Sequence, residues 1–301
     1  MTIVPTSFRR LIPTLFFCLI CVVPFPAWTG EPEGHGKVIH IKGSDTLIKA
    51  LKEWTRIYQE KNPGARVEVS GGGSGNGIAA LINGHVEIAS SSRLLREREI
   101  QLLTRKRVGQ VPIPHVVARD AVSVIVHPDN PINGLALHQL TDIYSKVRRT
   151  LTWGDFGVKV PECPDQKIMP INRKNNSGTY AFFKQTIFEK REHFDSQMLS
   201  MDASDSLVNM VGQMPCAIGY VGMAYVTNTV KTLCISKEQE VNAPCVPPTT
   251  ASTVDQAYPL ARSLYLYTLG EPRPEVMKFL DWVRGPEGQE ILTRSGYIPP
   301  P

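Results

Sequence analysis

The stretch "INRKNNSGTYAFF", residues 171–183, gathers side chains that are suited to holding an anion. Arg173 lies four residues before the triplet Ser177, Gly178 and Thr179, and an apolar aromatic stretch follows. Ser177 is a candidate helix N-cap, which would put Gly178 and Thr179 in the first turn of the helix. Exposed amides, two hydroxyls and a guanidinium would then converge on one point, and this combination favours an oxyanion.

A glycine-rich segment earlier in the chain offers a second group of donors. "SGGGSGNGIAAL" (70–81) joins a predicted strand to a predicted helix, so the Ser74 hydroxyl and the Gly75 amide are open to a ligand. The segment is not a P-loop, because no Gly-Lys-Ser/Thr follows it. It matches G-x-G-x-x-A, but the acidic residue that a dinucleotide site places about 20 residues further on is missing. The alternative interpretation is a flexible turn.

Two further segments follow predicted strands in the same way. "GSDT" (43–46) offers Ser44 and Asp45 as helix N-cap candidates, and "ASSSRLL" (89–95) brings three serines and Arg93. Taken singly, capping alone explains the first segment and exposed loop serines explain the second. In α/β sheets, however, ligands bind beyond the carboxyl ends of the strands, and all four segments fall at such ends. Together they predict one anion site.

Alternating patterns of strand and helix position these segments. The residues at 47, 51, 54 and 58 are Leu, Leu, Trp and Tyr, a spacing that predicts one buried helix face. Strands separated by helices are typical of a parallel sheet in an α/β domain. The strands are predicted at 37–43, 65–70 and 86–92, and the helices at 46–64 and 75–84.

Two long β-rich stretches, 115–132 and 258–269, lie about 140 residues apart and are longer than one domain usually needs. A chain of 301 residues favours two domains. We therefore interpret the two stretches as crossovers between two α/β lobes. The first lobe is then discontinuous, residues 37–119 plus 262–301, and the second lobe is residues 120–261.

The composition is that of a soluble globular protein, with 42% hydrophobic and 20% charged residues. Residues 1–30 read as a signal peptide, because Arg9 and Arg10 precede the apolar run 11–23, which is too short to span a bilayer. We expect cleavage near residues 27–30 and export to the periplasm. Residues 1–30 contain these two arginines and no acidic residue, so the net charge falls from +5 to +3 after cleavage. So mild a balance, without a Lys/Arg run, argues against nucleic acid as a partner.

Four cysteines remain after cleavage, Cys163, Cys216, Cys234 and Cys245. An even number in an exported chain predicts two disulfides, with three possible pairings. We favour Cys234 with Cys245, eleven residues apart across a proline-rich loop, which leaves Cys163 with Cys216. A metal site would need a CxxC pair or clustered histidines, and the sequence has neither, so no metal or other cofactor is expected.

The order of these motifs resembles that of the periplasmic phosphate-binding proteins of phosphate ABC transporters, the type II periplasmic binding proteins. The resemblance covers residues 37–300 and includes "WGDF", "PCAIGYVGMAYV" and "YPLARSLYLYT". It implies two α/β lobes joined by crossover strands, with a ligand cleft between them that closes on a dehydrated phosphate. The implied phosphate-binding residues are Ser44, Asp45, Thr46, Ser74, Gly75, Ser92, Arg93, Arg173, Ser177, Gly178 and Thr179.

The implied function is capture of inorganic phosphate and its delivery to a membrane permease, by a monomer that is not an enzyme. A receptor for sulfate, molybdate or tungstate is the nearest alternative, and a secreted phosphatase with a serine nucleophile is another. An adhesion or signalling role on the same fold is a third, since fold does not fix function. Many members of the family carry an aspartate where this chain has Ser92. We therefore hypothesise that Asp45 accepts the proton of hydrogen phosphate, with a simple helix N-cap as the alternative role.

Overall fold

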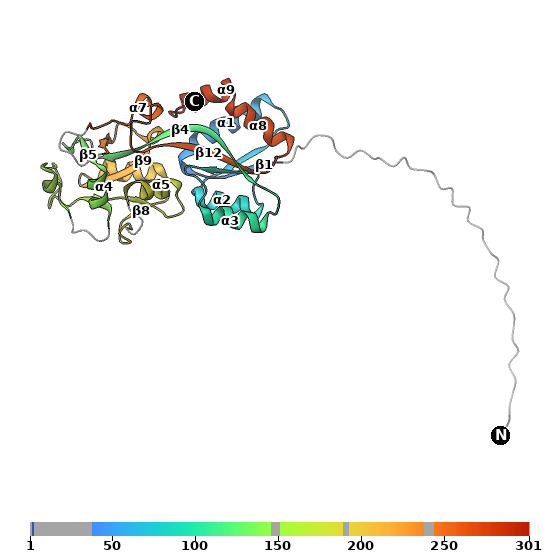
Figure 1. Cartoon of the computed structure of the whole chain (residues 1–301), viewed down its shortest axis with the longest axis horizontal. Helices are drawn as coiled ribbons and strands as arrows, with labels where there is room; N and C mark the ends of the chain where they lie inside the picture. The colour runs from blue at the N-terminus through green and yellow to red at the C-terminus, as the bar shows by residue number, and fades with distance from the viewer. Residues whose placement is uncertain (1, 3–37, 146–150, 189–192, 238–243, 301) are drawn as a thin grey trace. The chain divides into compact units, whose positions relative to one another are not determined.

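A mixed β-sheet with helices packed against it positions the loops that the sequence singled out (Figure 1). The computed structural model describes residues 2, 38–145, 151–188, 193–237 and 244–300. In the described residues the strand order is β2-β1-β3-β12-β4-β9-β6, with β10 paired to β4. The strands are β1 (Ile39–Gly43), β2 (Val67–Ser70), β3 (Ile88–Ser91), β4 (Pro112–Val126), β6 (Met169–Pro170), β9 (Ala217–Gly222), β10 (Lys231–Thr232) and β12 (Ala261–Leu269).

Helices and smaller strand pairs complete the architecture. The helices are α1 (Ile48–Lys61), α2 (Ser74–Asn83), α3 (Glu97–Lys106), α4 (Leu137–Tyr144), α5 (Gly178–Ile187), α6 (Ser204–Gln213), α7 (Thr250–Val254), α8 (Pro274–Arg284) and α9 (Pro286–Arg294). Short 3-10 turns are η1 (Asp45–Leu47), η2 (Trp153–Phe156) and η3 (Met223–Tyr225). Two small parallel pairs join β5 (Gly134–Ala136) to β11 (Cys234–Ser236) and β7 (Asn172–Arg173) to β8 (Ser200–Met201).

The helix that follows β1 buries the face that its sequence predicts. Leu47, Leu51, Trp54 and Tyr58 are all buried, and the Trp54 indole also donates to the Gly288 carbonyl at 2.7 Å. Burying each of these large apolar side chains contributes roughly 1.5–3 kcal/mol, so this face anchors α1 to the sheet. In Figure 1, α1, α8 and α9 lie on one face of this end of the sheet, and α2 and α3 lie on the other.

The sheet is parallel only in part. Strands β1, β2 and β3 pair in parallel, as predicted, and so do β6 and β9. The long strands β4 and β12 run antiparallel to each other and to their neighbours β9 and β3. A chain that leaves one lobe and later returns must traverse the sheet in both directions, so the two crossover strands run antiparallel to their neighbours while the strands of the first lobe pair in parallel.

The two long strands also divide the buried core. Val117 and Ala118 of β4 pack in one hydrophobic cluster with α1, α8 and α9, whereas Val122 and Val124 belong to a separate cluster with α4 and α5. Between them, Asp120 of β4 lies directly opposite Arg262 of β12 in the register. The α/β fold with crossover strands is therefore confirmed, and the two strands connect two separately packed regions.

Both disulfides form in the pairing that we favoured, Cys163 with Cys216 and Cys234 with Cys245. Apart from residue 2, the predicted signal peptide lies outside the described residues. None of the helices in the described part of the chain has the length and apolar character needed to cross a membrane.

Candidate functional site

The loops at the strand ends converge, as their sequences predicted. Thr46, which follows β1, lies with its Oγ1 3.0 Å from Oγ1 of Thr179 in α5. Ser74 at the start of α2 lies with its Oγ 3.3 Å from Oγ of Ser92, which follows β3. All four side chains are buried, although they are distant in the sequence. The site is therefore a buried cluster of hydroxyls contributed by four separate loops.

The beginnings of α2 and α5 meet at this cluster. Ser177 is the N-cap of α5, as predicted, and its hydroxyl accepts from the Tyr180 amide at 3.3 Å. The Gly75 amide donates to the Asn176 carbonyl at 2.9 Å, which ties the glycine-rich loop to the loop that precedes α5. A side chain at Gly178 would overlap the hydroxyls of Ser74 and Ser92. Glycine is thus required for two helix N-termini to approach so closely, and such termini favour negative charge.

Arg173 is fixed by four hydrogen bonds and is only 1% exposed. Its guanidinium donates to the carbonyls of Met201 and Asp202 at 3.2 and 2.7 Å, and to the Ser204 hydroxyl at 3.0 Å. The fourth bond, at 3.0 Å, joins Nη2 to Oδ2 of Asp45. Since a guanidinium carries five N–H groups, most of its capacity serves to hold this cation in place.

Asp45 is not the helix cap that capping preference suggested. Ser44 occupies the N-cap position of η1 without a capping bond, and Asp45 lies in the first turn. The Asp45 carboxylate instead binds Arg173 through Oδ2 and accepts from the Gly72 amide through Oδ1 at 2.8 Å. The Ser44 hydroxyl is buried and has no hydrogen-bond partner among the described residues. The alternative role of Asp45 as a simple N-cap is therefore wrong, and Asp45 is half of an ion pair.

A second ion pair, which sequence reasoning missed, lies at the crossover point. Arg262 binds Oδ2 of Asp120 through Nε at 2.9 Å and through Nη2 at 2.7 Å, and the two side chains are 2% and 0% exposed. Arg262 Nη2 also donates to the hydroxyls of Thr179 and Thr46, at 3.0 and 3.3 Å. The signal was charge inside each apolar β stretch, Arg119 and Asp120 in "VVARDAVSVIV" and Arg262 in "PLARSLYLYTL". Charges rarely occupy such positions unless they are paired.

Burial acts on the two members of this pair in opposite directions. Burial raises the pKa of the Asp120 carboxyl, while the charge of Arg262 acts against the rise. Burial lowers the pKa of the Arg262 guanidinium, and Asp120 opposes that change. Each group thus depends on the other to remain ionised. The two cations of the site, Arg173 and Arg262, are each matched by one carboxylate.

Arg93 is directed toward a different partner. Its guanidinium forms a bidentate ion pair with Glu99, at 2.8 and 2.7 Å, and donates to the Leu94 carbonyl. The resemblance implied Arg93 as a phosphate-binding residue, and in the structure its guanidinium meets the Glu99 carboxylate. The role of the predicted site residues in binding phosphate remains a prediction.

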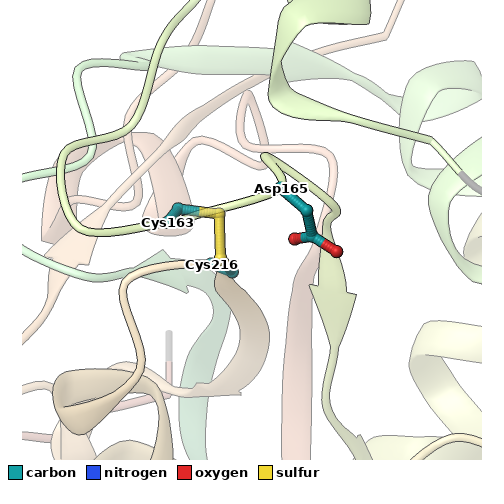
Figure 2. Close-up of side chains that lie close together, drawn as sticks. All are labelled: Cys163, Asp165 and Cys216. Atoms are coloured by element: carbon teal, nitrogen blue, oxygen red, sulfur yellow. A yellow bond between two sulfur atoms is a disulfide. The ribbon is translucent and has the colours of Figure 1, made fainter.

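Within the described residues, one cluster of side chains has atoms of the kind that bind metals. It consists of Cys163, Asp165 and Cys216 (Figure 2). The two sulfurs are joined in a disulfide, as Figure 2 shows. Sulfur binds metals as thiolate, and a disulfide has no thiolate to offer. This leaves Asp165 with a neutral sulfur bridge beside it, so the cluster does not have the chemistry of a metal centre.

Comparisons with known proteins agree with this geometry. A family model described as a PBP superfamily domain matches residues 29–287. The phosphate-binding protein PstS of Pseudomonas aeruginosa is 32% identical over 269 residues, which cover 86% of this chain and 82% of that protein. The structure of an ABC-type phosphate transport receptor from Vibrio cholerae is 26% identical with a TM-score of 0.68, and the match covers 87% of this chain and 100% of that one.

A further solved structure supports the fold. A protein from Clostridium perfringens, described as a phosphate ABC transporter substrate-binding protein with bound phosphate, matches with a TM-score of 0.75 and 24% identity. The match covers 88% of this chain and 100% of that one. The two-lobe arrangement expected from the sequence is thus shared with experimentally determined structures.

Proposed function

Since the chain belongs to the PBP superfamily, and within it to the family of phosphate-binding proteins, we propose that it captures inorganic phosphate in the cleft between its lobes and delivers it to the permease of an ABC transporter. The observation that carries the proposal is the convergence of buried hydroxyls from four loops beside two arginines. Hydroxyls and helix N-termini supply oriented neutral donors, and the arginines supply charged donors, although Asp45 and Asp120 balance their charge.

The proposed ligand set follows from this convergence and combines neutral donors with one ion pair. Arg173 adds a charged donor to the set, and Asp45, its ion-pair partner, adds an acceptor. The neutral donors are the hydroxyls or amides of Ser44, Thr46, Ser74, Gly75, Ser92, Ser177, Gly178 and Thr179. Arg262 joins the set, because its guanidinium already contacts the hydroxyls of Thr46 and Thr179. Arg93, which was predicted as a phosphate ligand, is left out of the proposed set, because its guanidinium is paired with Glu99.

The lobe boundaries that the sequence suggested, 37–119 plus 262–301 and 120–261, fit the division of the core. Hydrophobic clusters end on either side of Asp120 and Arg262, so bending of β4 and β12 near this pair would move one lobe against the other without disrupting either core. Such hinge closure around a ligand removes water and strengthens each hydrogen bond to it.

We propose that the protein acts as an exported monomer and catalyses no reaction. A serine nucleophile needs a base beside it. Among the described residues, the hydroxyls of Ser74, Ser92, Thr46 and Thr179 bond to one another, to the Ser92 amide or to Arg262, and not to an imidazole or a carboxylate. The secreted phosphatase is therefore the weaker alternative.

Calorimetry of the mature protein with phosphate, arsenate, sulfate and molybdate tests the proposal. Binding of one phosphate per chain, with sulfate and molybdate much weaker, is the expected result. Tighter binding of sulfate or molybdate would transfer the proposal to another oxyanion. Stimulation of phosphate uptake in vesicles that carry the permease separates a transport role from signalling or adhesion.

A further inference from the structure

A wide cationic groove lies beside the anion site. It encloses about 960 Å³, which is far more than a single phosphate fills. Its lining comes from the start of α2, from α3, from the loop before α5 and from α5 itself. The described residues that carry its charge are Arg93, Arg96, Arg98, Lys184 and Glu99.

The groove is directly connected to the site along both loops. Gly75 lines the groove and follows Ser74 of the site, while Asn176 lines the groove and precedes Ser177. These two loops touch through the Gly75 amide and the Asn176 carbonyl, and the Asn176 side chain donates to the Gly72 carbonyl at 2.9 Å. The seam between the loops is thus part of the lining of the groove, and separation of the loops would open the groove toward the hydroxyl cluster.

Counted over the described residues, the groove carries net positive charge, whereas the site does not. Arg93 is neutralised by Glu99, but Arg96 and Arg98 form no ion pair among the described residues. Lys184 bonds to Nδ1 of His193 at 2.8 Å, which leaves its charge uncompensated. Three cations therefore face the groove. In the site, by contrast, Asp45 and Asp120 balance the two arginines.

The cations of the groove are close enough to act on one another. Burial and the neighbouring Arg93 lower the pKa of the Arg96 guanidinium, Glu99 acts against this change, and Arg98 adds to it. Crowding like charges costs stability unless an anion is attracted in return. A buried site whose charges balance exerts little attraction on an anion in solution, so long-range attraction has to come from outside the site.

We propose that this groove is a capture site for divalent oxyanions, which collects phosphate at the seam and guides it into the opening cleft. The inference rests on the proposed phosphate-binding function. The groove raises the rate of association, because a cleft lined with one sign of charge concentrates its ligand and can speed association by 10-fold or more, on the order of 10–10³. It does not hold the phosphate once the lobes have closed, so it leaves the dissociation rate unchanged.

The test measures association and dissociation of radiolabelled phosphate in the full mature chain. The variant Arg96→Gln/Arg98→Gln/Lys184→Gln removes the three uncompensated charges. The control Lys52→Gln/Arg66→Gln/Lys278→Gln removes three charges from exposed positions on α1, before β2 and on α8. Dissociation is followed by chase with unlabelled phosphate, and the association rate is obtained from it and the equilibrium constant.

At about 0.01 M ionic strength, where the Debye length is about 30 Å, the groove variant should associate roughly tenfold more slowly than the control. At 0.5 M NaCl the difference should shrink below about twofold, and the dissociation rates should agree throughout. The charge-conserving variant Arg96→Lys/Arg98→Lys should keep most of the wild-type association rate.

Equal association rates in the groove variant and the control would overturn the capture site while leaving phosphate binding intact. A loss that persists at high salt, or that lies in the dissociation rate, would overturn it too, since those side chains would then act on bound phosphate or on folding. If the wild-type protein retains no phosphate, the proposed function fails and the capture of phosphate fails with it.

Discussion

The ion pair between Asp120 and Arg262 gives the sharpest test of how the site is built. Replacing Asp120 by Asn keeps the shape of the side chain but removes the negative charge. Arg262, which is 2% exposed, then keeps a buried charge without a counter-ion. Removing one partner of a buried pair typically costs 3–5 kcal/mol. Because Asn still accepts a hydrogen bond, we expect about 3 kcal/mol.

In a chain of this size, 1 kcal/mol corresponds to roughly 2–4 °C in Tm, so the Asp120→Asn protein should melt about 6–12 °C below wild type. Thermal unfolding followed by circular dichroism measures this shift. The matched control is Asp281→Asn, which removes an exposed carboxylate paired with Arg284 on the surface of α8. A surface pair of this kind contributes at most about 1 kcal/mol.

Two further measurements identify the cause. The double variant Asp120→Asn/Arg262→Gln should melt above the single variant, because it leaves no unpaired charge in the interior. Phosphate should protect the single variant more strongly than wild type, because its site has gained a net positive charge beside Thr46 and Thr179. An Asp120→Asn protein that melts like the Asp281→Asn control would refute the reasoning.

Three more outcomes follow from the site. Asp45→Asn should reduce the preference for phosphate over sulfate, as measured by calorimetry, and unaltered selectivity would place the proton acceptor elsewhere. The same variant should lower Tm by several degrees, because it leaves Arg173 unpaired. Arg173→Ala should weaken phosphate binding at least tenfold more than Arg93→Ala, and comparable losses would contradict this ranking. Burial acts to raise the pKa of Glu99, but hydrogen bonds from the Arg93 side chain and the Arg96 amide outweigh burial, so the pKa is lowered. The ionised Glu99 therefore stabilises the fold at pH values above its unfolded pKa near 4.5. This contribution is lost as the pH falls through the lowered pKa of the folded protein. Unfolding by denaturant between pH 7 and 3 should show a smaller loss of stability for Glu99→Gln than for wild type, and parallel curves would refute this assignment.

The loops of the site could be predicted because each is a local pattern. A strand, a cluster of Gly and Ser and a helix start lie within a dozen residues, and the rule that ligands bind beyond strand ends brings such segments together. The crossovers were predictable for a similar reason, because an unusually long β stretch can be recognised in the sequence without knowing which strand it pairs with. Ser177 as the N-cap of α5 followed from the same local chemistry.

The ion pairs could not be predicted in this way, because their partners lie far apart in the chain. Arg262 and Asp120 are 142 residues apart and meet only through the antiparallel register of β4 and β12. Asp45 and Arg173 are separated by 128 residues and come from different sides of the site. Pairing of this kind depends on tertiary register, which no local pattern encodes. Helix α3 was missed although its sequence is amphipathic, and only Leu103 of its residues is buried, so it contributes little to the core.

These pairings change how discrimination between oxyanions has to be understood. Because position 92 is a serine and not an aspartate, a carboxylate acceptor for the proton of hydrogen phosphate has to come from another residue. Asp45 has both oxygens engaged, by Arg173 and by the Gly72 amide, yet a carboxylate has about four lone-pair sites and retains capacity to accept. The Ser92 hydroxyl is a second acceptor, since a hydroxyl donates and accepts and either Ser74 or Ser92 can donate across their contact.

The two acceptors differ in charge, and this difference decides what each can do. A hydroxyl can turn its proton toward sulfate and donate, so it cannot exclude an anion that lacks a proton. A carboxylate has no proton to turn and repels fully deprotonated sulfate, which makes it the group able to discriminate. A site that relies on Ser92 should therefore bind both anions, whereas a site that relies on Asp45 should reject sulfate.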